Sequence, residues 1–366
     1  MRKHSKDSTA AQAGGRRVKQ LTIGIDLGDK QSQYCVLNGK GEIAEEGTLR
    51  TTPEGFQQWL AGRQRCRIVV EAGGHSPWVS RLLEAAGQEV LVANPSRLPM
   101  IYASQKKNDR MDARRLAQLA RVDASLLAPI RHRSAPAQAD LSVIRARESL
   151  VEARTKLINA VRGLVKTSGA RVKKCASRSF PKQAAGQVPE ILRPAVEPLL
   201  ETIEGLSEQI KHYDQLLEEM AERRYPETEL MTQVPGVGTL TALTFRLTLD
   251  DAERFRRSRD VGGYLGLRPR QQDSGEQTPQ LRITKAGDRY LRSTLVNCAH
   301  HILGPFGADT DLRRWGLKLC ARGGKNAKKR AIVAVARKLA VLLHHLWVCA
   351  EVYEPLRNQP VESVAA

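Results

Sequence analysis

The chain has 366 residues, 41% of them hydrophobic, so it is long enough for two or three domains with their own cores and is not disordered throughout. Its 59 lysines and arginines outnumber its 39 acidic residues, and the formal net charge of +20 predicts a polyanionic partner. A membrane-spanning protein is not expected, because Arg337, Lys338, His344 and His345 interrupt the apolar run at 331–350.

Both ends of the chain are predicted to be tails. Residues 1–20 are polar and basic, which predicts a disordered segment that attracts phosphates, and residues 351–366 are expected to fray. The N-terminus has no apolar signal segment, and the six cysteines lie far apart without metal-ligand spacing. We therefore expect an intracellular protein whose polyanionic partner is a nucleic acid.

Strand and helix signals alternate over residues 21–134. Apolar runs predict strands at 21–27, 33–37, 42–51, 67–71 and 89–93, with a hairpin turn at Asn38-Gly39. Helical spacing predicts helices at 53–60, 77–86 and 109–121. Three consecutive strands followed by strands that alternate with helices predict an α/β domain, with a mixed sheet covered by helices.

Residues 135–225 have the apolar spacing of long helices. The series Ile203, Leu206, Ile210, Tyr213, Leu217 and Met220 runs at alternating spacings of three and four residues, which is typical of a coiled-coil seam. This pattern predicts two long helices that either form a hairpin or pair with another subunit.

Residues 226–350 are predicted to form a mainly helical unit. The turn Val234-Pro-Gly236-Val-Gly238 suits a helix-hairpin-helix, whose glycines let backbone N–H groups approach a DNA phosphate, and it equally suits a plain connection between helices. The segment 312–350 contains basic residues but no acidic ones, which suits phosphate binding or a solvated basic helix face.

Four acidic side chains are candidates for catalysis. Asp26 and Glu71 each end an apolar strand, and Asp109 and Asp112 share one face of a helix. If the two strands are neighbours, the carboxylates converge, and their mutual repulsion then favours hard divalent cations such as Mg²⁺. Two such ions would activate a nucleophile and stabilise a leaving oxygen in phosphoryl transfer.

Each of these residues also has an ordinary structural explanation. Asp26 precedes a glycine and suits a turn, Asp109 suits a helix N-cap, and Asp112 lies among arginines that suit a surface ion pair. Glu71 is harder to explain, because a charge directly after Ile-Val-Val is costly without a partner. The combination favours a metal site.

The motifs around these residues resemble a known family. Ile25-Asp26-Leu-Gly28, Val70-Glu71-Ala-Gly73 and Lys107-Asn-Asp109-Arg-Met-Asp112-Ala113 are similar to the DEDD tetrad of insertion-sequence transposases with a RuvC-like N-terminal domain, the bridge-RNA-guided recombinases. The resemblance implies a ribonuclease-H-like fold for residues 21–134. It makes Asp26, Glu71, Asp109 and Asp112 the catalytic tetrad, which would bind Mg²⁺ or Mn²⁺.

The third predicted unit resembles the C-terminal domain of the same family. The similar stretches are Tyr264 to Gly275 and Ile283 to Arg292, and in the family a serine followed by a glycine is the nucleophile. That match falls on Ser274, which from its neighbours alone suits a turn, with Ser258 and Ser293 as weaker rivals. The resemblance implies a phosphoserine intermediate and a composite site whose two parts come from different subunits.

The resemblance also implies the domain plan and the partners. It implies a RuvC-like domain at 21–134, a coiled-coil or dimerisation segment at 135–225 and a transposase domain at 226–350. Expected partners are double-stranded donor and target DNA, a noncoding guide RNA and further copies of the chain as a dimer or tetramer, in the nucleoid of a prokaryotic cytoplasm. Candidate nucleic-acid-binding residues are Gly236, Gly238, Arg268, Arg270, Lys285, Arg289, Arg292, Arg322, Lys325, Lys328, Lys329 and Arg330.

Two other functions stay open at this point. Gly24-Ile-Asp26-Leu-Gly28 also resembles a phosphate loop of actin-like ATPases and sugar kinases, although no second such loop follows and a net charge of +20 does not suit a small-metabolite enzyme. A non-catalytic nucleic-acid-binding protein accounts for the basic charge equally well.

Overall fold

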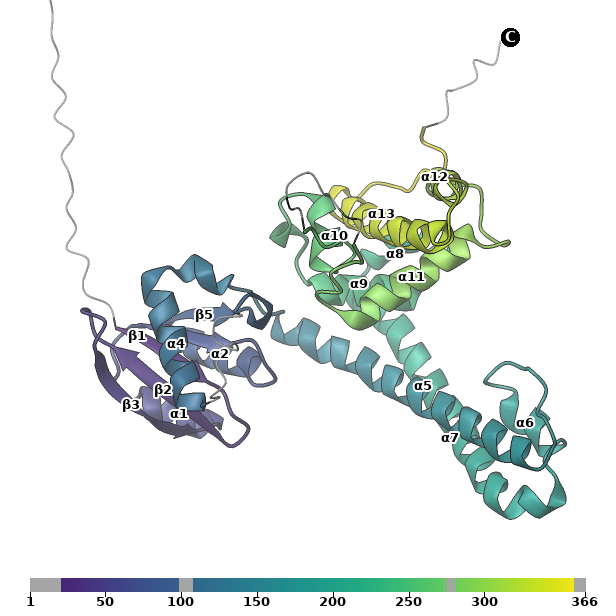
Figure 1. The fold of residues 1–366 in the computed structure, drawn as a ribbon, viewed down its shortest axis with the longest axis horizontal. Helices are drawn as coiled ribbons and strands as arrows, with labels where there is room; N and C mark the ends of the chain where they lie inside the picture. Colours follow the sequence, from purple (N-terminus) through teal and green to yellow (C-terminus); the bar gives the residue numbers. More distant parts are fainter. Residues whose placement is uncertain (1–20, 99–107, 273, 275–278, 280, 359–366) are drawn as a thin grey trace, which may run out of the picture. The chain divides into compact units, whose positions relative to one another are not determined.

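The computed structural model of the protein describes residues 21–98, 108–272, 274, 279 and 281–358. The chain folds into two compact units that divide between His132 and Arg133 (Figure 1). The predicted N-terminal tail, 1–20, lies outside the described residues, as do Asp273 and Gly275 on either side of the candidate nucleophile.

The first unit is built on a five-stranded mixed sheet, as predicted. Its strands are β1 (Thr22–Asp26), β2 (Gln31–Leu37), β3 (Ile43–Arg50), β4 (Arg67–Glu71) and β5 (Glu89–Ala93), and their order in the sheet is β3-β2-β1-β4-β5. β1 is antiparallel to β2 and parallel to β4, and β4 is parallel to β5. β1 is therefore the central strand, with the candidate Asp26 at its carboxyl end.

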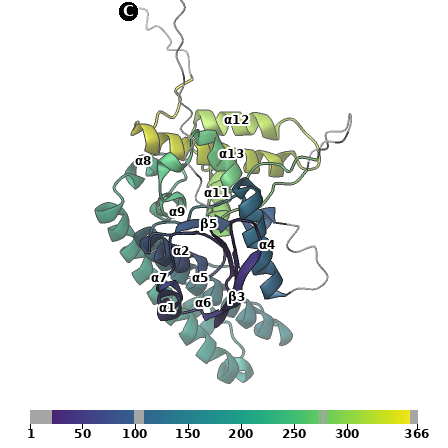
Figure 2. The same ribbon diagram turned by 90° about the vertical axis from the view of Figure 1, so that its left-hand side faces the viewer.

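Helices cover both faces of this sheet. Figure 2 shows α1 (Pro53–Leu60) and α2 (Ser76–Ala85) on one side and α4 (Asp109–Val122) on the other. Because successive side chains of a strand point to opposite faces, Ile25 and Val70 pack with Phe56 of α1, whereas Val69 packs with Leu116 of α4. This alternation fixes the face on which every later residue of β1 and β4 lies.

Gly24 lets α4 approach β1 closely. A Cβ atom at this position would lie 2.1 Å from the carbonyl oxygen of Ala113 and 2.6 Å from the backbone nitrogen of Ala117. Both are backbone atoms, so no side chain can move aside to make room. Glycine at the centre of β1 therefore sets the distance between the sheet and the helix that carries Asp109 and Asp112.

We expect Gly24→Ala to destabilise the first unit by about 1–3 kcal/mol, because the added methyl group forces the helix away from the sheet. Thermal unfolding followed by circular dichroism measures this as a lower midpoint. Gly73→Ala is the matched control, since a Cβ at Gly73 meets no atom within 4 Å. An unfolding midpoint for Gly24→Ala as high as that of the control would contradict the close packing of α4.

The turn between β2 and β3 is longer than the predicted hairpin at Asn38-Gly39. The Asn38 side chain accepts hydrogen bonds from the backbone nitrogens of Lys40 and Glu42 at 2.8 and 3.0 Å. Gly41, with φ of 87°, supplies the left-handed residue. The prediction was wrong in detail because the Asn38 side chain caps a wider loop than a two-residue turn.

The second unit is helical. Its helices are α5 (Ala135–Thr167), α6 (Phe180–Ala185), α7 (Arg193–Arg224), α8 (Thr228–Thr232), α9 (Thr239–Leu249), α10 (Val261–Tyr264), α11 (Arg289–Leu303), α12 (Asp311–Cys320) and α13 (Ala327–Cys349). Short 3₁₀ turns occur in both units at η1 (Pro95–Arg97), η2 (Ala124–Leu127), η3 (Glu190–Leu192), η4 (Ala252–Arg254) and η5 (Ser258–Asp260).

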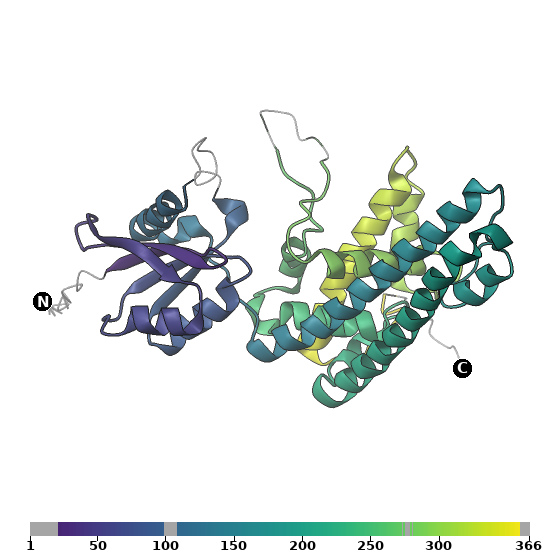
Figure 3. The ribbon, with the colours of Figure 1, turned by 90° about the horizontal axis from the view of Figure 1, so that it is seen from below.

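The two long helices α5 and α7 lie side by side within the chain (Figure 3). On α7, Ile203 packs with Ile158 of α5, and Leu217 packs with Leu141 and Ile144. Of the two predicted alternatives for this segment, the hairpin is the one observed. The buried residues of the seam at 203–220 are thus covered by α5, and pairing of this helical segment with another subunit stays a prediction.

α13 is the central helix of the second unit. Val335, Leu339 and Leu343 are fully buried against residues of α9 and α11. It is the one helix in the described part of the chain that is long and apolar enough to cross a membrane, and 44% of its apolar window is buried in the protein. Packing in the core accounts for the apolar residues on one side of this helix.

The chain after α13 returns to the unit. The backbone nitrogen of Asp311 donates to the carbonyl oxygen of Pro355 at 2.7 Å, and that of Tyr353 donates to the Gln233 side chain at 2.9 Å. Residues 353–358 are therefore docked, whereas the sequence predicted a frayed tail from 351. Residues 359–366 lie outside the described residues.

Candidate active site

Asp26 and Glu71 lie side by side at the carboxyl edge of the sheet. In the parallel pair β1–β4, Ile25 is opposite Val70, and Asp26 and Glu71 are the next residues of each strand. Gly24 contacts α4, and Val69 packs against α4. Side chains two positions further along a strand point to the same face, and those positions are Asp26 and Glu71. Both carboxylates therefore project from the α4 face of the sheet.

α4 runs antiparallel to β1. Near its C-terminal end, the carbonyl oxygen of Ala120 accepts a hydrogen bond at 3.4 Å from Arg67, which begins β4. The next residue, Arg121, donates to the carbonyl oxygen of Gly39 at 2.6 Å, and Gly39 lies just beyond the end of β2 that pairs with the start of β1. The N-terminal end of α4 therefore lies toward the carboxyl ends of β1 and β4.

This orientation brings Asp109 and Asp112 toward the edge that carries Asp26 and Glu71. Asp112 lies on the side of α4 that packs against the sheet, and it is only 7% exposed. Asp109 is the exposed first residue of the helix. The N-cap is Asn108, whose side chain accepts a hydrogen bond from the Arg110 backbone at 3.1 Å, so the alternative of Asp109 as N-cap is wrong.

Glu46 of β3 holds two of the arginines near these aspartates. Arg110 donates to a Glu46 carboxylate oxygen at 2.5 Å, and Arg114 lies 3.4 Å from the other oxygen. Burial opposes ionisation of Glu46, but the hydrogen bond from Arg110 and the charge of Arg114 outweigh it and lower its pKa. Asp112 is approached by Arg115, at 3.6 Å. Of the predicted ion-pair alternative for Asp112, the pair with Arg115 is observed, whereas Arg110 and Arg114 pair with Glu46.

The donor set at this edge fits a hard divalent cation. The candidate ligands are carboxylate oxygens, the type that such ions prefer, and Arg115 already provides a positive charge beside the nearly buried Asp112. Cys35 lies opposite Gly24 in the sheet, and burial, the main cause, raises its pKa to about 11. Its thiol is therefore neutral and is not a soft metal ligand. The residues present suit Mg²⁺ or Mn²⁺ rather than a thiolate-bound metal.

Ser274 lies on a two-stranded ribbon of the second unit. The backbone nitrogen of Arg270 donates to the carbonyl oxygen of Arg282 at 2.9 Å, and that of Thr284 donates to the carbonyl oxygen of Arg268 at 2.9 Å. Between these bonds, Pro269 pairs with Ile283. Ser274 is exposed and follows Arg270 by four residues. Figure 3 shows this ribbon, in green, extending away from the helices of its unit. An exposed serine on a projecting ribbon is accessible to a large substrate.

The base of the ribbon is fixed by residues of the two C-terminal motifs. Gly266 and Gly287 both have positive φ, and a Cβ on either would lie 2.2 Å from a backbone atom, of Ala286 and Tyr264 respectively. The guanidinium of Arg292 donates to the carbonyl oxygens of Ala286 and Leu265 at 2.7 and 3.1 Å. Burial lowers the pKa of Arg292. These bonds give Arg292 a structural role beside its predicted contact with nucleic acid.

The predicted phosphate-binding glycines differ in their surroundings. Gly236 has φ of 91°, and a Cβ there would lie 2.9 Å from the ring of His301 on α11, so packing requires this glycine. Gly238 is the exposed N-cap of α9, with open space around it. The turn joins α8 and α9, as a plain connection would. Contact between Gly238 and a phosphate stays a prediction.

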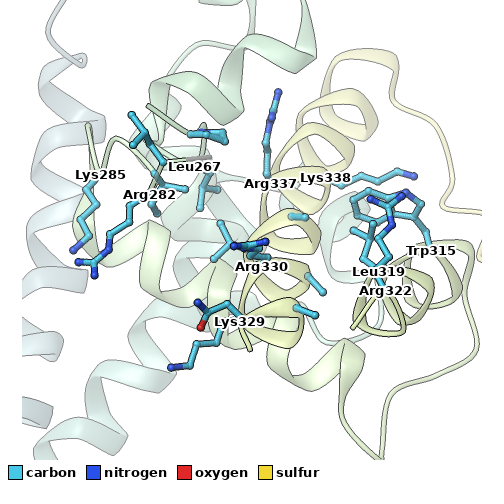
Figure 4. A pocket seen from close by; sticks show the side chains of 18 of the residues that line it. Leu267, Arg282, Lys285, Trp315, Leu319, Arg322, Lys329, Arg330, Arg337 and Lys338 are labelled. Atoms are coloured by element: carbon cyan, nitrogen blue, oxygen red, sulfur yellow. The ribbon is translucent and has the colours of Figure 1, made fainter. Parts of the chain in front are cut away.

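The remaining predicted nucleic-acid-binding residues are exposed on the second unit. They are Arg268, Arg270, Lys285, Arg289, Arg322, Lys325, Lys328, Lys329 and Arg330. Several of them border a groove of about 1090 Å³ between the ribbon and helices α12 and α13 (Figure 4). Sequence reasoning missed Arg282 and Trp315 in this groove, because nothing in the local pattern of 267–285 predicted that a ribbon folds over α13.

Both units match known transposases. Residues 23–168 match a transposase family of the DEDD type named after IS110, and residues 228–309 match the transposase family IS116/IS110/IS902. The first match includes the four candidate carboxylates and the second includes Ser274.

Individual relatives agree with these matches. The transposase for insertion sequence element IS1111A of Coxiella burnetii is 29% identical over 92% of this chain and 93% of its own length. The transposase for insertion sequence element IS1328 of Yersinia enterocolitica is 28% identical over 76% of this chain and 82% of its own. A pilin gene-inverting protein of Moraxella lacunata is 28% identical over 31% of this chain and 34% of its own. The chain therefore belongs to the DEDD transposases of the IS110 type.

Proposed function

We propose that the protein is an insertion-sequence transposase that cuts and rejoins DNA through a phosphoserine at Ser274, with Asp26, Glu71, Asp109 and Asp112 as the catalytic carboxylates. The observation that carries the proposal is the position of Asp26 and Glu71, adjacent on one face at the carboxyl ends of two parallel strands, with the start of α4 toward them. Four acidic candidates from distant parts of a chain with a net charge of +20, two of them neighbours in the sheet, suit chemistry on a polyanion.

The serine supplies the covalent step. Its Oγ attacks a DNA phosphorus, the P–Oγ bond forms, and the bond from phosphorus to the 3′ oxygen breaks. The serine proton passes to a base, and the leaving 3′ oxygen takes up a proton to become a hydroxyl group. Because the phosphoserine is still a phosphodiester, a 3′-hydroxyl of another DNA end displaces the serine, and rejoining needs no ATP.

The four carboxylates would hold Mg²⁺ or Mn²⁺. When bound there, the ion polarises the phosphate and stabilises charge on the attacking and leaving oxygens. The exposed Arg268, Arg270, Lys285 and Arg289 lie on the ribbon or at its base, where they neutralise the negative charge of the bound DNA. Arg115 stays beside Asp112 and limits the repulsion among the carboxylates.

The partners follow from the same chemistry. We expect Ser274 and the carboxylates, which belong to separate units of the chain, to form a composite site with parts from different subunits of a dimer or tetramer. Donor and target DNA would bind near Gly238 and the ribbon. The exposed Lys325 and Lys328, which do not line the groove, suit the phosphates of a noncoding guide RNA. The functional division is then a RuvC-like domain at 21–134, a helical segment at 135–225 and a transposase domain at 226–350.

Strand transfer by the purified protein tests this function. With guide RNA, donor DNA, target DNA and Mg²⁺, we expect recombinant product on a gel, complete loss of product with EDTA, and recovery with excess Mg²⁺. A preparation that binds DNA but gives no product with the element's own RNA and ends would support the non-catalytic alternative. Product formed in EDTA would contradict the metal-dependent mechanism.

A further inference from the structure

The groove of the second unit combines an apolar floor with a basic rim. α13 has two sides, and the side toward the core carries Ile332, Val335 and Leu339. The other side carries Val333, Ala334 and Val341, which line the groove. Helix α12 adds Trp315 and Leu319, and the ribbon adds Leu267, Pro269 and Ile283. An apolar surface on both walls and the floor is thus left open toward solvent, in a cavity of about 1090 Å³.

Positive charge surrounds this apolar floor on every wall. The cations that line the groove are Arg282, Lys285, Arg322, Lys329, Arg330, Arg337 and Lys338. No acidic side chain lines it among the described residues. Figure 4 shows Arg282 and Lys285 on the ribbon side, facing Arg330 and Arg337 of α13. The Lys338 ammonium lies 4.6 Å from the centre of the Trp315 ring, so the aromatic wall is itself bordered by charge.

This arrangement matches a ligand that has flat apolar groups on one side and anionic groups on the other. Duplex DNA presents phosphates around its whole outer surface, so it makes no use of an apolar floor. A strand with unpaired bases presents its bases and its phosphates separately, and a positive groove with apolar and aromatic contacts binds such a strand. The groove therefore favours a single strand over a duplex.

The ribbon links the groove to the candidate nucleophile. Pro269 and Ile283 form the groove wall, and Ser274 follows Arg270 by four residues, a reach of about 14 Å at most for an extended chain. The lining has a single amide side chain, Asn326, and few side-chain acceptors that would select the 2′-hydroxyl of RNA. DNA joined to Ser274 is thus the strand that the ribbon places next to the groove.

We propose that the groove between the ribbon and α12–α13 binds a single strand of DNA next to the phosphoserine, with unpaired bases on Val333, Ala334 and Val341 and phosphates on the surrounding cations. This inference rests on the proposed function, because it is Ser274 that selects DNA as the occupant. Binding in the groove keeps the cleaved strand close until another end attacks the phosphoserine.

Fluorescence anisotropy of the full-length protein tests the groove. The probes are a labelled single-stranded DNA, the same sequence as a duplex, and the same sequence as RNA. Ala334→Glu places a carboxylate in the floor on a helix position that tolerates glutamate. We expect it to weaken single-strand binding about tenfold and duplex binding far less.

A charge-matched pair of variants provides a second measurement. Arg330→Ala and Arg223→Ala both remove one exposed arginine of the second unit, but Arg223 lies on α7 and does not line the groove. Only Arg330→Ala is expected to reduce the slope of log affinity against log salt for the single strand, by about 0.7 for one lost phosphate contact. Equal slopes for the two variants would overturn the proposal.

The remaining outcomes are also decisive. Ala334→Glu with a wild-type unfolding midpoint and unchanged single-strand binding, or with equal losses for strand and duplex, overturns the proposal. The proposal is also overturned if the RNA probe binds more tightly than the DNA probe and loses more affinity in Ala334→Glu. Failure of the proposed function gives a different result. The same preparations would then form no covalent DNA adduct at Ser274, but the groove variants would still change the affinity for single-stranded DNA.

Discussion

Strand transfer is expected to fall by about a thousandfold or more when Asp26 is replaced by asparagine or Glu71 by glutamine. Each replacement keeps the shape of the side chain and removes its charge, so the site loses affinity for Mg²⁺ and stabilisation of the transition state. Single-turnover strand transfer at saturating Mg²⁺ measures the loss. We expect the two variants to fail equally, because the two carboxylates lie side by side at one edge of the sheet.

Glu89→Gln is the matched control for these variants. Glu89 begins β5, at the opposite end of the sheet, where it pairs with Arg67 at 2.7 Å. This replacement removes one charge from the same sheet but should leave strand transfer within about a factor of two, since an ion pair of this kind contributes little to stability. Normal strand transfer by Asp26→Asn or Glu71→Gln would contradict the assignment of the carboxylates.

The second large effect is expected from Ser274→Ala, which should abolish both strand transfer and the covalent protein–DNA adduct. Alanine removes the oxygen atom that is proposed to form the bond to phosphorus. Ser293→Ala is the control, because Ser293 is also an exposed serine of the second unit, on α11, and was a rival candidate. Gel analysis of denatured reactions with labelled DNA detects the adduct.

The two serine variants must give opposite results. An adduct that persists in Ser274→Ala and disappears in Ser293→Ala would transfer the role of nucleophile to Ser293. Loss of the adduct in both variants would point to an effect on folding or DNA binding, which the unfolding midpoints and the duplex affinity of each variant decide.

The elements of the first unit could be predicted from local patterns. Runs such as Ile68-Val-Val70 are β-branched and apolar, and Pro53 and Pro77 mark helix starts, so strands and helices are predicted close to their observed positions. The order β3-β2-β1-β4-β5 could not be read in this way, because it depends on which strands pair across long stretches of chain. Only that order makes Asp26 and Glu71 neighbours.

Other features depend on contacts that local sequence does not specify. The seam at 203–220 has the same spacing whether its partner is α5 or another subunit, and the observed partner is α5. The paired stretches around Pro269 and Ile283 have weak strand propensity and are held by Gly266, Gly287 and Arg292 at their base, so this pairing is not predicted from the sequence. For the same reason the groove could not be predicted from the basic residues of 312–350 alone.

The proposed mechanism requires that acidic side chains of the first unit drive formation of a covalent bond at Ser274 of the second. Mass spectrometry of a trapped and digested adduct measures this directly, with wild-type protein and Asp26→Asn compared at equal DNA occupancy. We expect a nucleotide remnant on the peptide that contains Ser274 in the wild type and none in Asp26→Asn. A remnant on a different residue, or equal labelling of Ser274 in both proteins, would contradict the claim.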